Sequence, residues 1–273
     1  MNVSRGYQFS SALGQWEPSF DRRGFVDDSL SLVTWNVWFD DYAFEERTQG
    51  LLEELHQQRP DIVALQEVTP ALLKTLSKTD WLQKEYTLSE FAPERMGDYG
   101  AVLLSRRAPE AVFRLRLPTG MGRYALVSEF STGQGRLGVA VVHLESLRIS
   151  AGVRGQQLRQ LFDRLEASSA VVLMGDFNFC STDTDENGRL DSRYLDLWPS
   201  MSVDPGYTED TAINSMRWAH TGQEKQVRYD RVLLRDDHRR WRCESIALLG
   251  THPLGPELFV SDHFGLVARL RAP

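Results

Sequence analysis

The stretch that most constrains this chain is VVLMGDFN, at residues 171–178. Its four apolar residues, two of them β-branched, lead directly into a glycine and an acid, a pattern typical of a buried strand that ends in a tight turn. Because Gly175 lets the backbone bend or another group approach closely, Asp176 and Asn178 can face a cleft at the edge of a sheet. The same pattern also fits an Asx turn in which both side chains serve only the local backbone.

An earlier part of the chain has a strand, a helix and a second strand in succession. Residues 31–36 predict a strand, apolar residues recur at helical spacing over 43–58, and residues 61–67 predict a strand that ends in an acid. A unit of this length places its two strands in parallel, so the strands end at the same edge of the sheet. We therefore expect Asn36 and Glu67 to lie side by side.

A second unit of the same kind contains the stretch described first. Residues 137–143 predict a strand, the apolar residues over 157–165 predict a helix, and the strand that ends at Asp176 follows. Between the two units, strands are expected at 99–105, 111–117 and 124–130, at the spacing of antiparallel hairpins. The other expected elements are helices at 70–77 and 194–198, strands at 227–234, 241–249 and 259–270, an exposed turn at 181–193 and a polar loop at 206–218.

Length and charge limit the organisation and the partners of the chain. At 273 residues and 41% hydrophobic content, the chain can bury a large core. We expect one domain at 30–273, preceded by a flexible lead-in at 1–29 that Trp16, Phe20 and Phe25 dock onto the domain. The formal net charge of −7 gives the molecule no general attraction to a polyanion, so any nucleic-acid or phosphate site must be a local basic patch.

The cysteines and the absence of long apolar runs predict the compartment. Cys180 and Cys243 are far apart and show no CxxC spacing, which favours reduced thiols over a disulfide scaffold or a structural zinc site. No apolar run approaches the roughly 18 residues of a membrane span, and residues 1–10 lack the pattern of a signal peptide. These features predict a soluble intracellular protein, cytoplasmic or nuclear, that is a monomer and does not bind membranes.

Polar side chains stand at the ends of several predicted strands. They are Asn36, Glu67, His143, Asp176, Asn178, Asp262 and His263. Gathering these polar and charged side chains at one edge costs free energy unless a ligand binds there. Oxygen ligands suit Mg²⁺ or Mn²⁺ better than zinc. We expect the ligand to be a cation together with a phosphate, because an Asp positioned by an Asn can orient or deprotonate an attacking water. Asp230, inside a predicted strand, requires a His or Arg partner.

Six short motifs occur along the chain in a characteristic order. TWN, LQE, HLES, GDxN, RYDR and SDHxG span residues 34–265 and resemble those of the endonuclease/exonuclease/phosphatase superfamily. The resemblance implies a deoxyribonuclease I-like fold, a four-layer α/β sandwich in which helices flank two packed, mostly antiparallel β-sheets. Within that superfamily, YTEDTAINSM and RYDRVLLR are similar to the tyrosyl-DNA phosphodiesterase branch. The resemblance thus implies a metal-dependent phosphodiesterase that processes blocked 5′ ends of nucleic acids, with a 5′ end or a single-stranded region as its partner.

The resemblance also implies a role for each site residue. Glu67 would hold Mg²⁺, with Mn²⁺ as a possible substitute, and Asp262 and Asn36 would lie close to the metal or its water network. Asp176 and Asn178 would position the nucleophilic water. From the residues themselves, Asn36 could instead cap a turn.

A further group would act on the phosphate. His263, oriented by Asp230, would stabilise the pentavalent phosphorus, and His143 and Ser146 would contact the scissile phosphate. Ser146 could instead cap the following helix, His143 could be a satisfied rim histidine, and Asp230 could pair with a nearby arginine. The arginines that could form a phosphate patch, or only a solvated face, are Arg123, Arg148, Arg154 and Arg217.

The chain departs from the family pattern at three positions. Trp38 stands where many relatives have Asp, which makes a second metal position doubtful. Cys180 stands where the tyrosyl-DNA phosphodiesterase branch has Arg, and Glu209 stands where that branch has Trp. Losing a cation and a stacking platform should weaken binding to single-stranded DNA.

These departures leave other functions open. Within the superfamily the alternatives are an RNA or abasic-DNA nuclease, or an enzyme acting on a small nucleotide or a phosphoinositide. Outside it, the alternative is a catalytically silent binding module that keeps the fold. Calcium binding at 181–193 is not favoured, because the final Glu of an EF-hand loop is missing.

Overall fold

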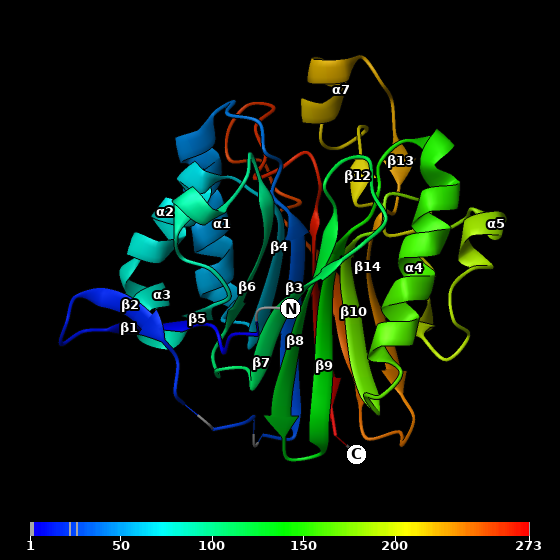
Figure 1. Ribbon diagram of the computed structural model, residues 1–273. Helices are drawn as coiled ribbons and strands as arrows, with labels where there is room; N and C mark the ends of the chain where they lie inside the picture. The colour runs from blue at the N-terminus through cyan, green and yellow to red at the C-terminus, as the bar shows by residue number, and fades with distance from the viewer. Residues whose placement is uncertain (1–2, 22, 26, 273) are drawn as a thin grey trace.

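Two β-sheets packed face to face form the centre of the molecule, and helices cover both outer faces (Figure 1). The computed structural model describes residues 3–21, 23–25 and 27–272. In spatial order, the larger sheet contains β15 (Arg242–Leu249), β16 (Gly265–Arg271), β3 (Ser29–Asn36), β4 (Ile62–Val68), β6 (Gly100–Ser105), β5 (Thr87–Leu88), β1 (Tyr7–Ser10) and β2 (Gln15–Pro18). The smaller sheet contains β11 (Leu195–Asp196), β14 (Asp230–Asp236), β10 (Ala170–Asp176), β9 (Gly135–His143), β8 (Tyr124–Thr132) and β7 (Ala111–Arg116). This arrangement confirms the predicted sandwich.

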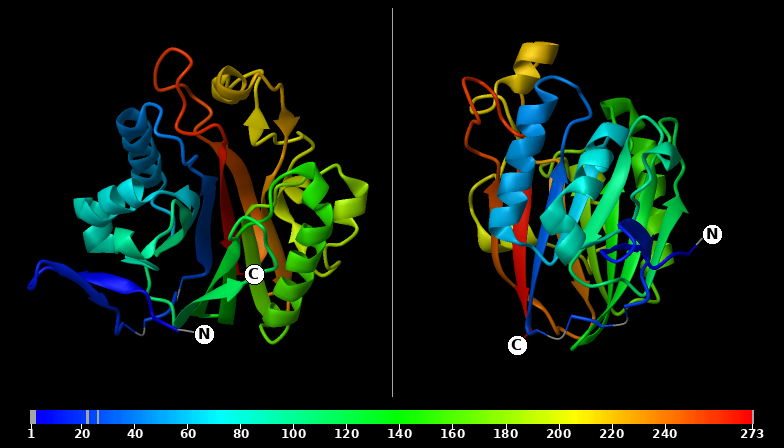
Figure 2. Two further views of the ribbon diagram at one scale, coloured as in Figure 1. Left: turned by 45° about the horizontal axis from the view of Figure 1, so that its top comes forward. Right: turned by 90° about the vertical axis from the view of Figure 1, so that its left-hand side faces the viewer.

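The helices lie on opposite sides of the sandwich. Those beside the larger sheet are α1 (Phe44–Gln58), α2 (Pro70–Lys78) and α3 (Asp80–Glu85), and α4 (Ala151–Leu165) and α5 (Thr184–Asn187) lie beside the smaller sheet (Figures 1 and 2). Shorter elements are η1 (Pro93–Arg95), η2 (Arg148–Ser150), α6 (Leu197–Met201) and α7 (Met216–Thr221). In Figure 1, α7 lies above the sheets, next to the hairpin of β12 (Glu209–Asp210) and β13 (Gln226–Val227). No described helix combines the length and apolarity that a membrane span requires.

Three apolar clusters hold the layers together. One lies between the sheets and includes Leu32 and Val172, a second joins the larger sheet to α1 and α2 through Leu51 and Leu73, and a third joins the smaller sheet to α4 through Leu161. Each of these side chains is almost fully buried, and burying one contributes roughly 1.5–3 kcal/mol. The rigid layers therefore fix the positions of the strand ends.

Both predicted strand-helix-strand units are present. β3 and β4 run in parallel with α1 between them, and β9 and β10 run in parallel with α4 between them. In the second pair, Asp176 lies opposite His143. The other paired strands in the described residues are antiparallel, as expected for this fold.

The N-terminal segment contains more structure than its sequence predicts. Within the predicted lead-in at 1–29, β1 and β2 form a hairpin on the edge of the larger sheet. Trp16 anchors it, because its indole Nε1 donates a hydrogen bond of 2.9 Å to the carbonyl oxygen of Ser77. Phe25 is buried as predicted, but Phe20 is 79% exposed, so its predicted docking is wrong. Strands this short carry too little periodicity to be seen in sequence.

Several element boundaries also differ from prediction near the C-terminal half. The predicted helix at 194–198 is displaced, since Leu195 is in β11 and α6 begins at Leu197. The predicted strand at 227–234 is broken, and β14 begins at Asp230. The break follows from Thr208, whose Oγ1 accepts hydrogen bonds of 3.1 Å from the backbone N–H groups of both Tyr229 and Asp230. Asp230 thus stands at a strand end, beside the other polar residues.

Candidate active site

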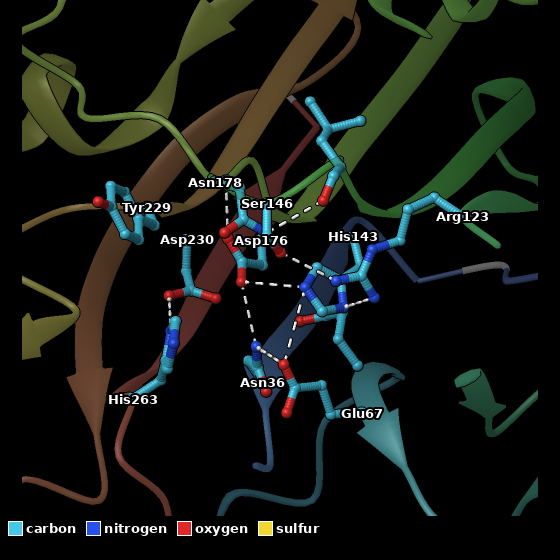
Figure 3. A network of polar contacts seen from close by, with 12 residues as sticks. Asn36, Glu67, Arg123, His143, Ser146, Asp176, Asn178, Tyr229, Asp230 and His263 are labelled. Carbon is cyan, nitrogen blue, oxygen red and sulfur yellow. Dashed lines mark hydrogen bonds and ion pairs between the residues drawn. The ribbon is translucent and has the colours of Figure 1, made fainter. Parts of the chain in front are cut away.

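The ends of three neighbouring strands form one row of polar side chains on the smaller sheet. Asp176, at the end of β10, lies opposite His143 of β9 on one side and opposite Asp230 of β14 on the other. Asn36 and Glu67 come from β3 and β4 of the larger sheet, and Figure 3 shows that they face this row. Side chains far apart in the sequence therefore meet between the two sheets.

Gly175 makes the row possible. Its φ of +135° is a backbone conformation that favours glycine, and an added Cβ would lie 2.0 Å from the carbonyl oxygen of Val142. Only glycine lets β9 and β10 run this close together just before Asp176.

Asn36 links the two sheets. Its Nδ2 donates hydrogen bonds of 3.1 Å to Oε1 of Glu67 and of 3.1 Å to Oδ2 of Asp176. Its Oδ1 accepts a hydrogen bond of 3.1 Å from the N–H of Trp38. Asn36 thus makes both the local turn contact and the contacts expected of a site residue.

A β-bulge directs Glu67 into the site. The register of β4 against β6 shifts between Leu65 and Val68, and Glu67 adopts a φ of +61°, which is uncommon for a residue with a side chain. Its Oε2 accepts a hydrogen bond of 2.9 Å from the N–H of Phe39. Burial, together with the negative charge of Asp262, raises the pKa of Glu67.

Asp176 and Asn178 form the turn that the sequence suggests. Oδ1 of Asp176 accepts a hydrogen bond of 2.8 Å from the N–H of Asn178, whose Nδ2 donates one of 3.0 Å to the carbonyl oxygen of Leu144. The Asx turn and the site role therefore coexist, because Oδ2 of Asp176 remains directed into the site. Burial and the nearby Asp230 raise the pKa of Asp176 to about 7.

His143 is a neutral imidazole. Its Nδ1 lies 3.0 Å from a guanidinium nitrogen of Arg123, and because arginine can only donate, Nδ1 must accept. Burial and the charge of Arg123 lower the pKa of His143 well below its usual range. The remaining proton is then on Nε2, which lies 3.5 Å from Oδ2 of Asp176 and 3.7 Å from Oε1 of Glu67.

Arg123 also positions Ser146 and contacts an aromatic side chain. The guanidinium donates a hydrogen bond of 3.0 Å to Oγ of Ser146 and lies 5.6 Å from the ring centroid of Tyr99. Ser146 is not the N-cap of the following helix, since Ser150 holds that place in α4. Phe39 stacks on the ring of Tyr99, with ring centroids 5.0 Å apart.

His263 is held between two carboxylates. Its Nδ1 lies 2.7 Å from Oδ2 of Asp230, and its Nε2 lies 3.1 Å from Oε1 of Glu209. Burial alone would lower the pKa of His263, but Asp230 and Glu209 outweigh burial and hold the pKa well above its usual range. His263 is therefore an imidazolium ion. The alternative partners of Asp230, Arg228 and Arg231, instead lie 2.9 and 3.9 Å from Oδ2 of Asp196.

Two predicted arginines have other roles. Arg217 lies 3.1 Å from Oδ2 of Asp262 and 3.8 Å from Oε2 of Glu209, so it balances acids inside the site. Arg154 is buried and bonds Glu186 through two nitrogens at 2.7 and 2.6 Å, so its assignment to a phosphate patch is wrong. The same pair makes Glu186 buried, in a segment expected to be an exposed turn. Arg148 is exposed in η2 and forms no ion pair with the described residues.

Sequence reasoning missed three contributing residues. Thr208 supports the start of β14, Tyr99 lies over Arg123, and Oγ of Ser261 donates a hydrogen bond of 2.7 Å to the carbonyl oxygen of Asn36. Ser261 precedes the Asp and His of the SDHxG motif, so its place in that motif was the available signal. Thr208 and Tyr99 carry no comparable signal, because their contacts depend on distant segments.

The donor set fits a divalent cation. The ligand atoms of Asp176, Asp230 and His263 lie within 4.8 Å of one another, but a doubly protonated His263 has no lone pair for a metal, so the carboxylates are the candidate ligands. Oδ1 of Asp230 is buried and has no hydrogen-bond partner among the described residues, and the pKa of both Glu67 and Asp176 is raised by burial. A cation would offset this excess of buried negative charge, and oxygen donors suit a hard ion.

A sandwich of two sheets with a buried, acid-rich site at the strand ends is the arrangement of a class of phosphoester hydrolases. The sequence profile of the Endonuclease/Exonuclease/phosphatase family matches residues 33–263, and the chain belongs to this family.

Similar proteins extend over most of the chain. The curated tyrosyl-DNA phosphodiesterase 2 of Homo sapiens is 28% identical over 271 residues, which cover 95% of this chain and 73% of that protein. Its Rattus norvegicus counterpart is 28% identical over 256 residues, or 90% of this chain and 68% of that protein. Among solved structures, D. rerio TDP2 complexed with single strand DNA product has a TM-score of 0.76 and 27% identity, covering 90% of this chain and 100% of that chain. These relatives are phosphodiesterase hydrolases of the same family.

Proposed function

We propose that this chain is a metal-dependent phosphodiesterase that hydrolyses a phosphoester by in-line attack of water. Its proposed substrate is a nucleic-acid end that carries a 5′-tyrosyl or related blocking group. The observation that carries the proposal is the hydrogen-bonded link from Glu67 through Asn36 to Asp176, because it joins residues of both sheets in one buried site. The tyrosyl-DNA phosphodiesterase 2 relatives support the substrate class.

Asp176 and Asn178 would act on the attacking water. A carboxylate with a pKa near 7 can accept a proton at neutral pH, and Asn36 fixes the direction of that carboxylate. Asn178 is held by Leu144 and can orient the water from the other side of the turn. Holding the water in place lowers the entropic cost of reaching the transition state.

The two histidines would act on the phosphate. His143 presents a neutral N–H, and His263 presents a positive charge toward the oxygens that become more negative during attack. Arg123 and Ser146 would contact the same phosphate beside His143. The water would displace the leaving group directly, with no covalent enzyme intermediate.

Glu67 and Asp262 would hold the divalent cation, with Mg²⁺ as the proposed ion and Mn²⁺ as the substitute. The mutual repulsion that raises the pKa of Glu67 next to Asp262 would be relieved by a bound cation. When bound, the ion would neutralise charge on the phosphoryl oxygens. Arg217, which is paired with Asp262, balances the acid in the free protein.

An aromatic corner beside His143 supports an aryl leaving group. Tyr99 lies between the guanidinium of Arg123 and the ring of Phe39, and its ring centroid is 6.4 Å from that of His143. A tyrosyl ring leaving the phosphate could stack here. Aryl leaving groups also need little protonation, which suits a site whose acids serve the metal and the water.

A panel of substrates tests the proposal. With Mg²⁺, the protein should release nitrophenol from thymidine 5′-monophosphate p-nitrophenyl ester, and EDTA should stop the release. Among 5′-tyrosyl DNA, abasic duplex, poly(A) and inositol phosphates, 5′-tyrosyl DNA should be turned over with the highest kcat/KM. Activity that survives both EDTA and Glu67→Ala would contradict the metal assignment, and no turnover on any substrate would indicate a binding module.

A further inference from the structure

Glu209 occupies the only ring nitrogen of His263 that Asp230 leaves available. Its Oε1 lies 3.1 Å from Nε2 of His263, and the residue is 2% exposed. Its other oxygen lies 3.0 Å from Nζ of Lys225 and 3.8 Å from Nε of Arg217. Despite its burial, the charge of His263, followed by those of Lys225 and Arg217, lowers the pKa of Glu209 to about 2, so it is an anion throughout the physiological range.

Three cationic groups therefore converge on one carboxylate. Arg217 and Lys225 come from the connection between β12 and β13, and His263 comes from the segment before β16. Together they surround two oxygen atoms that share a negative charge. A phosphoryl group presents the same features, namely oxygens that share negative charge and accept charge-assisted hydrogen bonds. The surroundings of the Glu209 carboxylate are those of a phosphate-binding pocket.

The contact conflicts with the role proposed for His263. With Nδ1 taken by Asp230, only Nε2 can donate to a phosphoryl oxygen, and this nitrogen already lies 3.1 Å from Oε1 of Glu209. One N–H cannot make two strong hydrogen bonds in different directions. The contact between His263 and Glu209 must open before His263 can contact the substrate.

Building on the proposed function, we propose that Glu209 is an internal substitute for a substrate phosphate. In the free protein its carboxylate fills a pocket formed by His263, Lys225 and Arg217, and a phosphate group of the substrate displaces it. The pocket thus binds a phosphate monoanion or dianion in competition with Glu209. The short β12–β13 hairpin that carries Glu209 pairs through two residues on each strand, so a local shift there opens few contacts.

The competition makes a prediction of definite sign. Replacing the charged carboxylate by an amide of the same size, in Glu209→Gln, weakens the competitor but keeps the packing. The kcat/KM for thymidine 5′-monophosphate p-nitrophenyl ester should rise by roughly tenfold, mostly through a lower KM, because the attraction between the Glu209 charge and the surrounding cations is lost from the free state only. Calorimetric titration without metal should also show tighter binding of inorganic phosphate.

The control is the next acid in the same strand. Asp210 is also buried, but its carboxylate bonds the N–H of Ala212 and the amide of Gln226 and forms no contact with His263 among the described residues. Asp210→Asn should therefore leave kcat/KM and phosphate affinity unchanged. If Glu209→Gln fails to fold, Glu209→Asp provides the test, since the shorter side chain keeps the charge but loses its reach to Nε2.

The outcomes separate this inference from the proposed function. If the wild-type protein hydrolyses no phosphodiester, the proposed function fails. If the wild-type protein is active and Glu209→Gln and Glu209→Asp leave kcat/KM unchanged, the displacement is contradicted. A loss of kcat at constant KM would also contradict it, and would instead make Glu209 a positioning residue that His263 needs during the reaction.

Discussion

His143 and His263 are both buried at strand ends of one site, with exposures of 7% and 4%, yet they carry different charges. Burial lowers the pKa of both imidazoles. Beside His143 the nearest strong charge is the Arg123 guanidinium, which lowers the pKa further, whereas Asp230 and Glu209 beside His263 raise it. Because burial acts in the same direction on both, the partner charges account for the difference in protonation between the two histidines.

The difference gives the site two kinds of donor. The side of His143 offers a neutral N–H next to the acids that would hold metal and water, so it adds no positive charge that would compete with the cation. The side of His263 offers a full positive charge to the phosphate. A site built from two identical imidazolium ions would repel the metal, and one built from two neutral imidazoles would stabilise the transition state less.

Removing the charged histidine should have the largest effect. His263→Ala should lower kcat by about 10²- to 10³-fold, because the loss of one oriented donor in a buried oxyanion site costs roughly this much. Steady-state kinetics with the nitrophenyl ester measures the loss. His238→Ala, on an exposed turn, is the matched control and should be silent. Retention of more than a tenth of the wild-type kcat in His263→Ala would remove His263 from the mechanism.

Weakening the His143 side of the site should lower activity less than removing His263 does, and it should alter the pH dependence of activity. Arg123→Met removes the cation that lowers the pKa of His143, and we expect kcat/KM to fall by roughly 10- to 100-fold. The pKa of His143 should rise at the same time, so that protonation of His143 lowers activity at the acidic end of the pH profile. An unchanged profile would show that Arg123 does not set the charge of His143.

Asp176, which lies between the His143 side and the His263 side of the site, should make the stability of the folded protein depend on pH. Its pKa is raised from 3.8 to about 7, so the folded protein holds this proton more tightly than the unfolded chain does. In EDTA, the free energy of unfolding should therefore fall as pH rises from about 4 to 7. Asp176→Asn should remove this fall and raise the Tm by roughly 5 °C at pH 8, with little change at pH 4. A Tm difference that is the same at both pH values would contradict the raised pKa.

The sequence predicts the elements whose signals are local. Both strand-helix-strand units follow from apolar periodicity, and their parallel pairing brings Asn36 next to Glu67 and His143 next to Asp176. The ordered motifs indicate which residues meet. The motifs do not indicate the side-chain contacts that determine the charge of each histidine.

The contacts that escaped prediction join segments through side chains alone. From the sequence, Glu209 indicates the loss of a stacking platform, whereas in the structure its carboxylate contacts the imidazole of His263. Arg154 looks like a surface cation, but it is buried against Glu186. In both cases the acid of the pair lies in a segment without regular periodicity, and only the tertiary fold determines which charges meet.

The charge states of His143 and His263 are the centre of this account, and imidazole nitrogen NMR of the free protein measures them directly. With signals assigned by their loss in His143→Gln and His263→Gln, His143 should remain neutral with its proton on Nε2 between pH 5 and 8. His263 should remain doubly protonated over the same range. Two histidines that both titrate near pH 6.5, as exposed imidazoles do, would contradict the account.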